Sequence, residues 1–561
     1  MLGIARTITL ITIGFIVSHL FTAMGMSIIA AKPFHLYYPF ALTNFYLINL
    51  INFRTLPTEF HIFFWSYIIG ITVPFGIHQT LFGEQSIISK YKRNKYGYAK
   101  FATPRLIKKM GLNFKEGIVF GLVKQKFCLG KRSIIRSNQP LSTLIIAPTG
   151  TGKTAGFIIP TLKTLSNSVV IFDIKGELHQ TTSQDRINLG HRVLIFDVID
   201  GIKFNPFARN QLPQDLRKLK SYIKNISNLL FESPSKGGRD GNYFVNSAKE
   251  LFNTIALYLI IQDGYTTIPK IKGLLLSDKN SKTIFSILAE KLEEKIENIE
   301  EGNDRKNILL QLQHGINQIL QISEAKDQFL GVIGSLTTIL AAFDDMEIQE
   351  ILDCENSSIV ADDLRKQKIT IYIRVKDIDL ERLRPLVALF FDTLISDIIS
   401  NTPTPTDNQI TFILDEFGNL GKVSKLIKAT TISRSYKLNQ IFILQDLAQI
   451  SSIYSVEERS ILESNTAYKI ILQQNNFDTA KRISEIIGFR TDTKVSKSSK
   501  SSQTFSMTKN NDRGSISSSQ EGIYLVTPQD ILNLNKNHCL IIVQGFSANV
   551  ILADIAWWFK Q

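Results

Sequence analysis

The stretch Leu144-Ile145-Ile146-Ala147-Pro148-Thr149-Gly150-Thr151-Gly152-Lys153-Thr154-Ala155-Gly156-Phe157-Ile158-Ile159-Pro160 decides how the rest of the chain is interpreted. Residues 144–147 are an apolar run typical of a buried strand, and residues 148–153 form a turn that contains two glycines. The residues that follow predict a helix. A strand, a glycine-containing turn and a helix that starts near Lys-Thr together are the context of a phosphate-binding loop.

The residue types of this loop suit a nucleoside triphosphate. The glycines allow backbone N–H groups to turn inward around a phosphate, and the following helix directs its positive end at the same charge. Lys153 is expected to reach the β- and γ-phosphates, and the Thr154 hydroxyl is expected to ligate Mg²⁺. The predicted ATP-binding residues are Gly150, Thr151, Gly152, Lys153, Thr154 and Ala155.

The loop departs from the usual motif at its first position, where Ala147 replaces glycine. This change adds one methyl group to the turn and leaves the phosphate contacts intact. The competing interpretation is a chance match in a turn of Gly and Thr, which composition should produce in roughly a few per cent of chains of this length. The flanking strand and helix argue against chance.

Length and charge limit the class of protein. A chain of 561 residues is too long for one hydrophobic core, so two or three domains are expected. A net charge of +14 suggests an anionic neighbour, either nucleic acid or an acidic membrane face, and charge alone does not choose between them. The three cysteines form no CxxC pair, so the sequence supports neither a disulfide framework nor a zinc module.

Two apolar segments near the N-terminus predict membrane spans. Residues 7–31 contain no Asp, Glu, Lys or Arg, and a second apolar segment covers residues 60–82. A cleaved signal peptide is the competing interpretation, but the first run is long for one and a second segment follows it. Residues 36–53 are apolar enough for a third span, although their asparagines favour an interfacial or loop role.

Basic residues indicate the orientation in the membrane. Lysines and arginines are dense over residues 90–109, whereas the loop between the two predicted spans offers only Lys32 and Arg54. The positive-inside rule therefore places the large C-terminal part in the cytoplasm.

Short apolar runs that alternate with helical segments predict a parallel sheet covered on both faces. The predicted strands include residues 168–173, 193–197, 369–373, 409–414 and 440–444. Asp173 and Asp197 end two of these runs. Ligands bind at the carboxyl ends of such strands, although each aspartate can also cap the next helix.

Asp415 and Glu416 follow another strand and match what a phosphate-loop enzyme needs. Asp415 is predicted to hold the Mg²⁺ shell, and Glu416 is predicted to polarise an attacking water. Acidic pairs are common at helix N-termini, so this signal becomes strong only in combination with Lys153 and Thr154.

Two further polar residues are candidates for catalysis. Gln445 ends the strand 440–444, where its amide can contact the γ-phosphate or orient water. Arg434 lies between this strand and the preceding one. It is either an ordinary surface residue or, in a ring-shaped ATPase, a residue that reaches the γ-phosphate of a neighbouring subunit.

Other segments differ from this pattern. Residues from about 215 to 343 show long helical patterns that predict an all-helical insertion. Residues 494–520 are rich in Ser, Lys, Asn and Thr, and they predict a disordered or mobile loop. Trp557, Trp558 and Phe559 are interpreted as packing or partner-binding residues in preference to stacking on bases.

The chain resembles the coupling proteins of type IV secretion systems, the TraG/TraD-like family. The resemblance covers most of the chain and depends on motifs in sequence order, at residues 98–102, 147–160, 172–177, 205–207, 242–248, 414–418, 433–436 and 444–449. Two positions depart from the family pattern, since Lys100 and Phe101 stand where Arg and Trp are frequent. Residues 494–520 align poorly, and no role transfers to them.

The resemblance implies an α/β, RecA-like P-loop NTPase with a parallel sheet, an inserted all-α domain and an N-terminal two-helix transmembrane segment. We expect a transmembrane domain at 1–90, a nucleotide-binding domain in two parts at 91–206 and 346–561, and the all-α domain at 207–345. The family implies a multi-pass protein of the bacterial inner membrane, with a large cytoplasmic part, that contacts membrane lipid.

The family also implies a function, partners and site residues. A homo-hexamer would use ATP and Mg²⁺ to pass relaxase-bound DNA, effector proteins or both to the secretion channel. By motif, Lys153 and Thr154 bind nucleotide and Mg²⁺, Asp415 and Glu416 serve hydrolysis, Gln445 senses nucleotide, and Arg434 acts across the subunit boundary. Two other functions stay open: a membrane-tethered DNA translocase for chromosome segregation, and a docking receptor in which nucleotide only holds the ring together.

Overall fold

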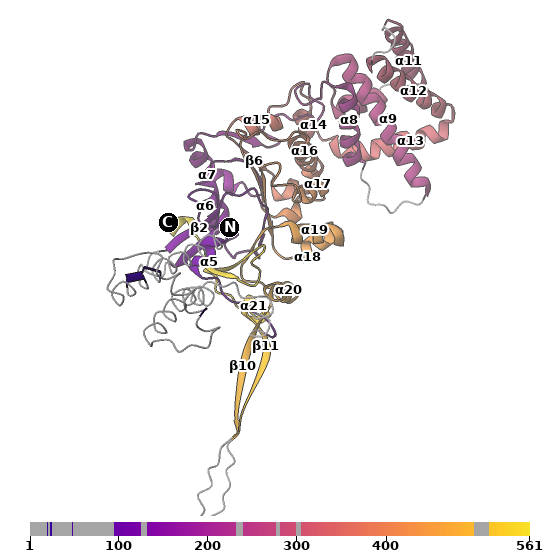
Figure 1. Cartoon of the computed structure of the whole chain (residues 1–561). Helices are drawn as coiled ribbons and strands as arrows, with labels where there is room; N and C mark the ends of the chain where they lie inside the picture. Colours follow the sequence, from indigo (N-terminus) through magenta and orange to yellow (C-terminus); the bar gives the residue numbers. More distant parts are fainter. Residues whose placement is uncertain are drawn as a thin grey trace, which may run out of the picture. The chain divides into compact units, whose positions relative to one another are not determined.

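The computed structural model describes residues 95–124, 132–231, 239–276, 281–298, 304–498 and 515–560, together with residues 19, 20, 23, 24 and 48 (Figure 1). The chain divides into two units, Met1–Lys95 and Tyr96–Gln561. The predicted spans at 7–31 and 60–82, and the segment 36–53, lie outside the described residues apart from those five positions.

Within the described part of the chain, no single helix has the length and apolar character needed to cross a bilayer. The helices Lys326–Phe343 and Met346–Leu352 meet the length and composition criteria only as a pair bent by 88°.

The larger unit is built on an 11-stranded sheet and a two-stranded ribbon. The strands of the sheet are β1 (Ile118–Lys124), β2 (Arg132–Ser137), β3 (Thr143–Ile146), β4 (Ser168–Asp173), β5 (Arg192–Phe196), β6 (Ile369–Arg374), β7 (Ile410–Leu414), β8 (Leu438–Leu444), β9 (Tyr468–Ile471), β12 (His538–Val543) and β13 (Ile551–Asp554). Their order is β2-β1-β13-β12-β9-β3-β8-β7-β4-β6-β5.

The sheet is mixed, so the prediction of a parallel sheet is right for one part of it only. The strands from β9 to β5 in this order all pair in parallel. The strands β12, β13, β1 and β2 pair antiparallel. β12 and β13, like β1 and β2, are joined by connections too short for a crossover helix, and hairpins of this kind must be antiparallel.

Helices cover both faces of the parallel part. They are α5 (Pro104–Lys109), η1 (Thr154–Ile158), α6 (Ile159–Leu162), α7 (Glu177–Asn188), η3 (Asp377–Asp379), α16 (Leu380–Ser400), η4 (Phe417–Asn419), α17 (Ser424–Ala429), α18 (Ala448–Ile453), α19 (Val456–Asn465), α20 (Phe477–Ile487), α21 (Pro528–Leu532) and η5 (Trp558–Lys560). Every residue of β3, β4, β7 and β8 is buried. Burial on both faces explains why these strands are continuous apolar runs without alternation.

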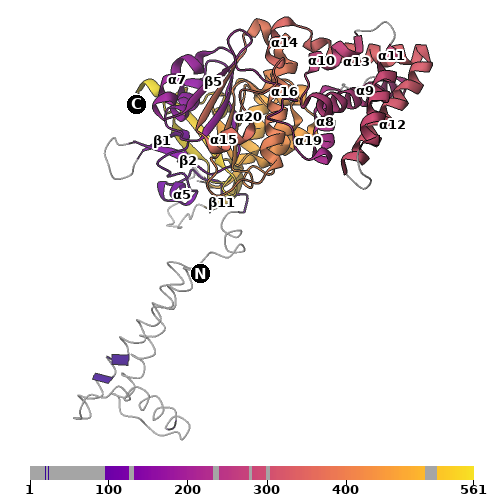
Figure 2. The same cartoon turned by 90° about the horizontal axis from the view of Figure 1, so that it is seen from above.

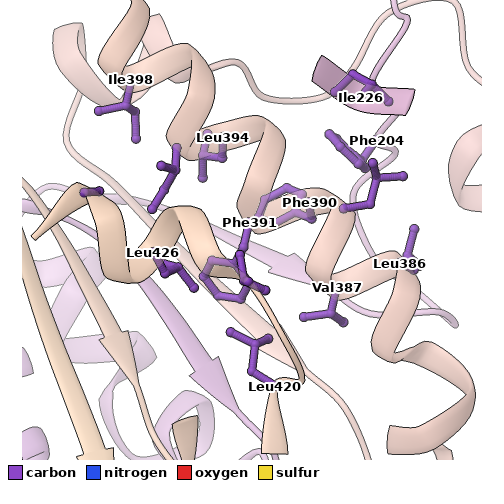
Figure 3. Close-up of a cluster of buried hydrophobic side chains, with 14 of the residues drawn as sticks. Phe204, Ile226, Leu386, Val387, Phe390, Phe391, Leu394, Ile398, Leu420 and Leu426 are labelled. Carbon is purple, nitrogen blue, oxygen red and sulfur yellow. The ribbon is translucent and has the colours of Figure 1, made fainter. Parts of the chain in front are cut away.

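Alternate residues of each central strand enter two different hydrophobic cores. Phe172 and Phe412 point to the core that contains α16, where Phe391 contacts both rings at centroid distances of 6.3 and 6.0 Å. Figure 3 shows Phe391 near Leu420 and Leu426, while Phe390 lies near Phe204. Ile171 and Ile413 belong to the opposite core with residues of η1 and α6.

An all-helical part stands between β5 and β6 in the sequence. Its helices are α8 (Leu216–Leu230), α9 (Arg239–Asp263), α10 (Ile268–Leu276), α11 (Ser281–Glu297), α12 (Asp304–Glu324), α13 (Lys326–Leu340), η2 (Ala341–Phe343), α14 (Met346–Leu352) and α15 (Ala361–Lys366). In Figure 2, α8 to α13 lie at the opposite end of the larger unit from β1 and β2.

Asn205 fixes the junction between the sheet and the helical part. Its side-chain nitrogen donates to the carbonyl oxygens of Thr266 and Cys354, each at 2.8 Å. Thr266 lies between α9 and α10, and Cys354 lies between α14 and α15, so fully buried Asn205 links the segment that follows β5 to two connections of the helical part. The Asn-Pro-Phe segment at 205–207 therefore has a structural role.

The segment predicted as a disordered loop, 494–520, contains parts of two paired strands. β10 (Phe489–Ser498) and β11 (Ser515–Tyr524) form an antiparallel ribbon from the pair Phe489 and Tyr524 to the pair Ser498 and Ser515 (Figure 1). The ribbon pairs through its backbone, and its Ser, Thr and Lys side chains give it no apolar face that composition could reveal. The prediction is thus wrong for 494–498 and 515–520, and residues 499–514 lie outside the described ones.

Buried Arg186 joins the end of α6 to β6, and among the described residues it forms no ion pair with a carboxylate. It donates to the carbonyl oxygens of Leu162 and Asn167 at 3.0 and 2.9 Å, and to Thr370 Oγ1 at 3.0 Å. Its Nη2 also lies 3.1 Å from the ring of His191, which accepts this bond as a neutral imidazole. Burial, and next the charge of Arg186, lower the pKa of His191 to about 4.

This arrangement predicts an acid-sensitive contribution to stability. Unfolded His191 binds a proton below its ordinary pKa of 6.5, whereas the folded ring stays neutral until about pH 4. Stability is therefore lost as pH falls from 6.5 to 4, by about 2 kcal/mol at pH 5. Thermal denaturation of the full chain from pH 7 to 5 should show a smaller acid loss in His191→Gln than in the wild type. Equal losses in the two proteins would contradict the assignment.

Candidate active site

The predicted site residues follow neighbouring parallel strands. β3, β8, β7 and β4 are adjacent in this order, and they all run in the same direction. Their carboxyl ends consequently meet at one edge, where ligands of such sheets bind. This edge carries the phosphate loop after β3, Gln445 after β8, Asp415 after β7, and Asp173 at the end of β4.

The glycines of the loop have the conformation that the motif requires. Gly150 and Gly152 adopt φ angles of 78° and 88°, a region that favours glycine. The Thr151 hydroxyl donates to the carbonyl oxygen of Pro148 at 2.6 Å and closes the turn. Ala147 is fully buried in the core below the loop, so its extra methyl group packs with the sheet.

Lys153 joins the loop to the acidic pair. Its Nζ lies 3.2 Å from Glu416 Oε1 and 3.4 Å from Asp415 Oδ1, and the lysine is only 8% exposed. The structure thus brings together the three residues that the sequence singled out from segments more than 260 positions apart. Their roles in nucleotide chemistry stay predictions.

A small cavity of about 40 Å³ adjoins these side chains. Its lining comprises Lys153, Thr154, Asp173, Ile174, Lys175, Glu177, Leu178, Asp415 and Glu416. This volume is far below the roughly 300–1,000 Å³ of sites that hold a small-molecule ligand. A contact of Lys153 Nζ with a bound phosphate would require the lysine to leave its two carboxylate partners. A larger cavity of about 580 Å³ between α8, α9 and α12 contains none of the predicted site residues.

Asp415 and Thr154 offer oxygen ligands that suit Mg²⁺. Burial raises the pKa of Asp415, the charge of Lys153 opposes this shift, and Glu416 adds to it. Asp415 Oδ1 is buried and makes no hydrogen bond within the described part of the chain, only the long ion pair with Lys153. A hydroxyl and a carboxylate, completed by phosphate oxygens and water, form the kind of donor set in which Mg²⁺ binds. The residues present fit the ion.

Glu416 is held in a strained backbone conformation. Its φ of 55° is uncommon for a residue with a side chain, and such strain costs about 1–3 kcal/mol. Asn419 Nδ2 donates to Glu416 Oε2 at 3.0 Å and leaves Oε1 for Lys153. Strain of this kind is concentrated at functional sites, and here it aims the carboxylate at the loop.

Asp173 both caps a helix and faces the small cavity, the two positions that the sequence left open for it. Its Oδ2 accepts the backbone N–H of His179 at 2.9 Å, which caps α7, and its side chain also lines the small cavity. Burial, with a further contribution from Asp415, raises the pKa of Asp173 to about 6. Asp197 instead makes an ion pair with Arg374 at 2.7 Å and belongs to a different cavity, so its role is structural.

Gln445 and Arg434 lie at opposite ends of β8. Gln445 follows the carboxyl end, and its backbone N–H donates to Gln449 Oε1 at 3.0 Å. Arg434 is exposed and precedes the amino end of β8. It therefore lies at the amino ends of the parallel strands, whereas Lys153 lies at their carboxyl ends. One chain therefore does not bring Arg434 to its own phosphate loop.

Sequence reasoning missed one neighbour of the loop, the C-terminal segment. A Cβ atom built on Gly152 would lie 2.2 Å from Trp557 Cη2, so the indole rests directly against this glycine. No local pattern reveals a contact between residues 405 positions apart in the chain. The packing of Trp557 agrees with the sequence analysis, but its place beside the phosphate loop was not foreseen.

Known proteins resemble this chain over most of its length. Residues 100–561 match a family model described as "Type IV secretory system Conjugative DNA transfer". The VirD4 protein of Rhizobium radiobacter is 27% identical over 493 residues, which are 86% of this chain and 66% of the relative. A conjugal transfer protein TraG of Escherichia coli is 24% identical over 480 residues, 79% of this chain and 72% of the relative. The chain spans just under two thirds of the VirD4 relative.

Solved structures share the fold. The bacterial conjugative coupling protein TrwBdeltaN70 in an unbound form has a TM-score of 0.54 at 15% identity, with 82% of this chain and 93% of that chain covered. TrwB in complex with a non-hydrolysable ATP analogue has a TM-score of 0.56 at 15% identity, with 82% and 96% covered. These similarities identify the larger unit as a RecA-like α/β NTPase fold. Because the family model matches well over half of its residues, this chain belongs to the family of type IV secretory system conjugative DNA transfer proteins.

Proposed function

We propose that this protein is an ATP-hydrolysing coupling protein. It recruits relaxase-bound DNA, effector proteins or both, and delivers them to a type IV secretion channel. The observation that carries this proposal is the position of Lys153 Nζ, which lies within 3.4 Å of both acidic residues beneath a phosphate loop. Family membership supports it, as do the TrwB structures with an ATP analogue and with ADP and Mg²⁺.

The proposed chemistry starts with Lys153, whose positive charge balances part of the negative charge of the acidic pair. Lys153 leaves Asp415 and Glu416 and meets the β- and γ-phosphate oxygens of ATP. Glu416 Oε1 then becomes free to polarise a water molecule, while Asn419 keeps hold of Oε2. Thr154 and Asp415 hold Mg²⁺, which neutralises charge on the phosphates when bound. Gln445, which follows the strand between those of Lys153 and Asp415, senses the γ-phosphate.

The position of Arg434 supports a ring of subunits. This exposed arginine lies on the edge of the sheet opposite the loop of its own chain, so its role at a γ-phosphate requires a neighbouring subunit. A homo-hexamer supplies such a neighbour at every site. We propose further that the apolar segments 7–31 and 60–82 anchor this ring in the bacterial inner membrane, with the larger unit in the cytoplasm.

We predict that Lys153→Ala and Glu416→Gln each lower ATP hydrolysis by about a hundredfold or more. Lys153→Ala should also weaken ATP binding, because it removes the charge that meets the phosphates. Glu416→Gln keeps the shape of the side chain and should bind ATP normally. Steady-state hydrolysis and equilibrium binding of the full-length protein in lipid nanodiscs measure both effects.

Substrate transfer in cells separates the motor from a passive receptor. Both variants should insert into the membrane and fail to transfer substrate. Normal transfer by Glu416→Gln, with its hydrolysis blocked, would contradict the proposed motor and favour a docking receptor.

Mixed rings test whether Arg434 acts between subunits. We expect Arg434→Ala and Lys153→Ala to be inactive alone, because every site in either ring lacks one residue. In a random equal mixture, roughly a quarter of the interfaces join an intact loop to an intact arginine. Hydrolysis should therefore recover partly on co-expression. An arginine that served its own chain would give no recovery, since neither variant contains both residues.

A further inference from the structure

The C-terminal segment reaches the same edge of the sheet as the phosphate loop. β9 is parallel to β3, β12 is antiparallel to β9, and β13 is antiparallel to β12. β13 therefore runs in the direction of β3. The residues after Asp554 leave the sheet at the edge where β3 delivers the loop.

Two glycines of the loop region accommodate this segment. Besides the contact of Gly152 with Trp557, a Cβ built on Gly156 would lie 2.2 Å from Ile555 Cγ2. At these two points only the hydrogen atoms of glycine fit between its backbone and the facing side chain. Ile555 is buried in the core, while the half-buried indole of Trp557 forms a wall beside Gly152.

The residues around Trp557 form an aromatic cluster that is partly exposed. The ring centroids of Trp557 and Phe559 are 5.6 Å apart, and Phe559 is 58% exposed. Trp557 Nε1 donates to Asn537 Oδ1 at 3.2 Å, which sets the orientation of the indole. Lys163 Nζ covers Trp558 at 4.9 Å from the ring centroid. Aromatic clusters of this kind at a protein surface mark binding sites.

We propose that Trp557 stacks on the purine base of the nucleotide whose phosphates bind to the loop. This inference deepens the proposed function and rests on it. In a nucleoside triphosphate one ribose separates the base from the α-phosphate, so the base lies close to the loop that holds the phosphates. Within the part of the chain that the structure describes, Trp557 contacts that loop with a flat apolar ring face, and Lys560 Nζ lies over this ring at 5.9 Å from its centroid.

The chemistry of this face defines the specificity. Stacking on an aromatic ring tolerates different bases, because each base has a π-face and no edge is read by hydrogen bonds. The one polar atom of Trp557 is already bonded to Asn537. The site therefore takes adenine and guanine equally well and binds the smaller pyrimidines less tightly.

The test compares nucleotides with inorganic tripolyphosphate, which has the phosphates but no base. Dissociation constants are measured with Mg²⁺ on the full-length protein in nanodiscs, for the wild type and for Trp557→Leu, Trp557→Phe and Trp558→Leu. Trp557→Leu keeps apolar contact with Gly152 and should weaken ATP and GTP binding about tenfold. Tripolyphosphate binding should change by less than about twofold. Trp557→Phe should retain most of the affinity, and the matched control Trp558→Leu should resemble the wild type.

Tryptophan fluorescence gives an independent readout. ATP should quench emission in the wild type and in Trp558→Leu, whereas tripolyphosphate should not, and the quenching should be lost in Trp557→Phe. Equal weakening of ATP and tripolyphosphate by Trp557→Leu would overturn the inference, since the indole would then only support the loop. Unchanged ATP binding would overturn it as well. A wild type that binds neither ligand would overturn the proposed function and this inference with it.

Discussion

The site depends on one ion-pair cluster, in which Lys153 pairs with two adjacent carboxylates. Asp415 and Glu416 leave β7 side by side, and Asp173 comes close enough for Asp415 to raise its pKa. The cavity is lined by four carboxylates and two lysines, which gives it an excess of negative charge. Removing a partner from a buried ion pair costs about 3–5 kcal/mol, because a charge is left without compensation. When Lys153 turns to phosphate, the carboxylates therefore favour another positive charge in its place, such as a divalent cation.

The order and register of the parallel strands bring the residues of this cluster together, although they are far apart in the sequence. The loop follows β3 and the acidic pair follows β7, with only β8 between them in the sheet. Since all three strands are buried, their apolar side chains fix the register and thereby the positions of the polar residues at their ends. Glu416 is adjusted further by its positive φ and by Asn419. The pairing of the strands thus determines where Glu416 lies, and its strained backbone conformation determines where its carboxylate points.

This arrangement explains how much the sequence could predict. Central strands such as β4 and β7 are continuous apolar runs because helices cover both faces, so the sequence reveals them directly. β2 is only partly buried, and its pattern gives no comparable signal. The sequences of β10 and β11 consist mostly of polar residues, so their composition gives no strand signal. Lys153 and Glu416 were predictable because each belongs to a recognisable sequence motif. The contact of Trp557 with Gly152 was not, because it depends on the course of β12 and β13. Long-range contacts without a motif follow only from the topology.

We propose that Lys153 exchanges its carboxylate partners for phosphate when nucleotide binds. The most direct measurement is a structure of the full-length protein with Mg²⁺ and a non-hydrolysable ATP analogue. We expect Lys153 Nζ within hydrogen-bonding distance of the β- and γ-phosphate oxygens and separated from Glu416 Oε1. A nucleotide bound elsewhere, with Lys153 Nζ still 3.2 Å from Glu416, would contradict it.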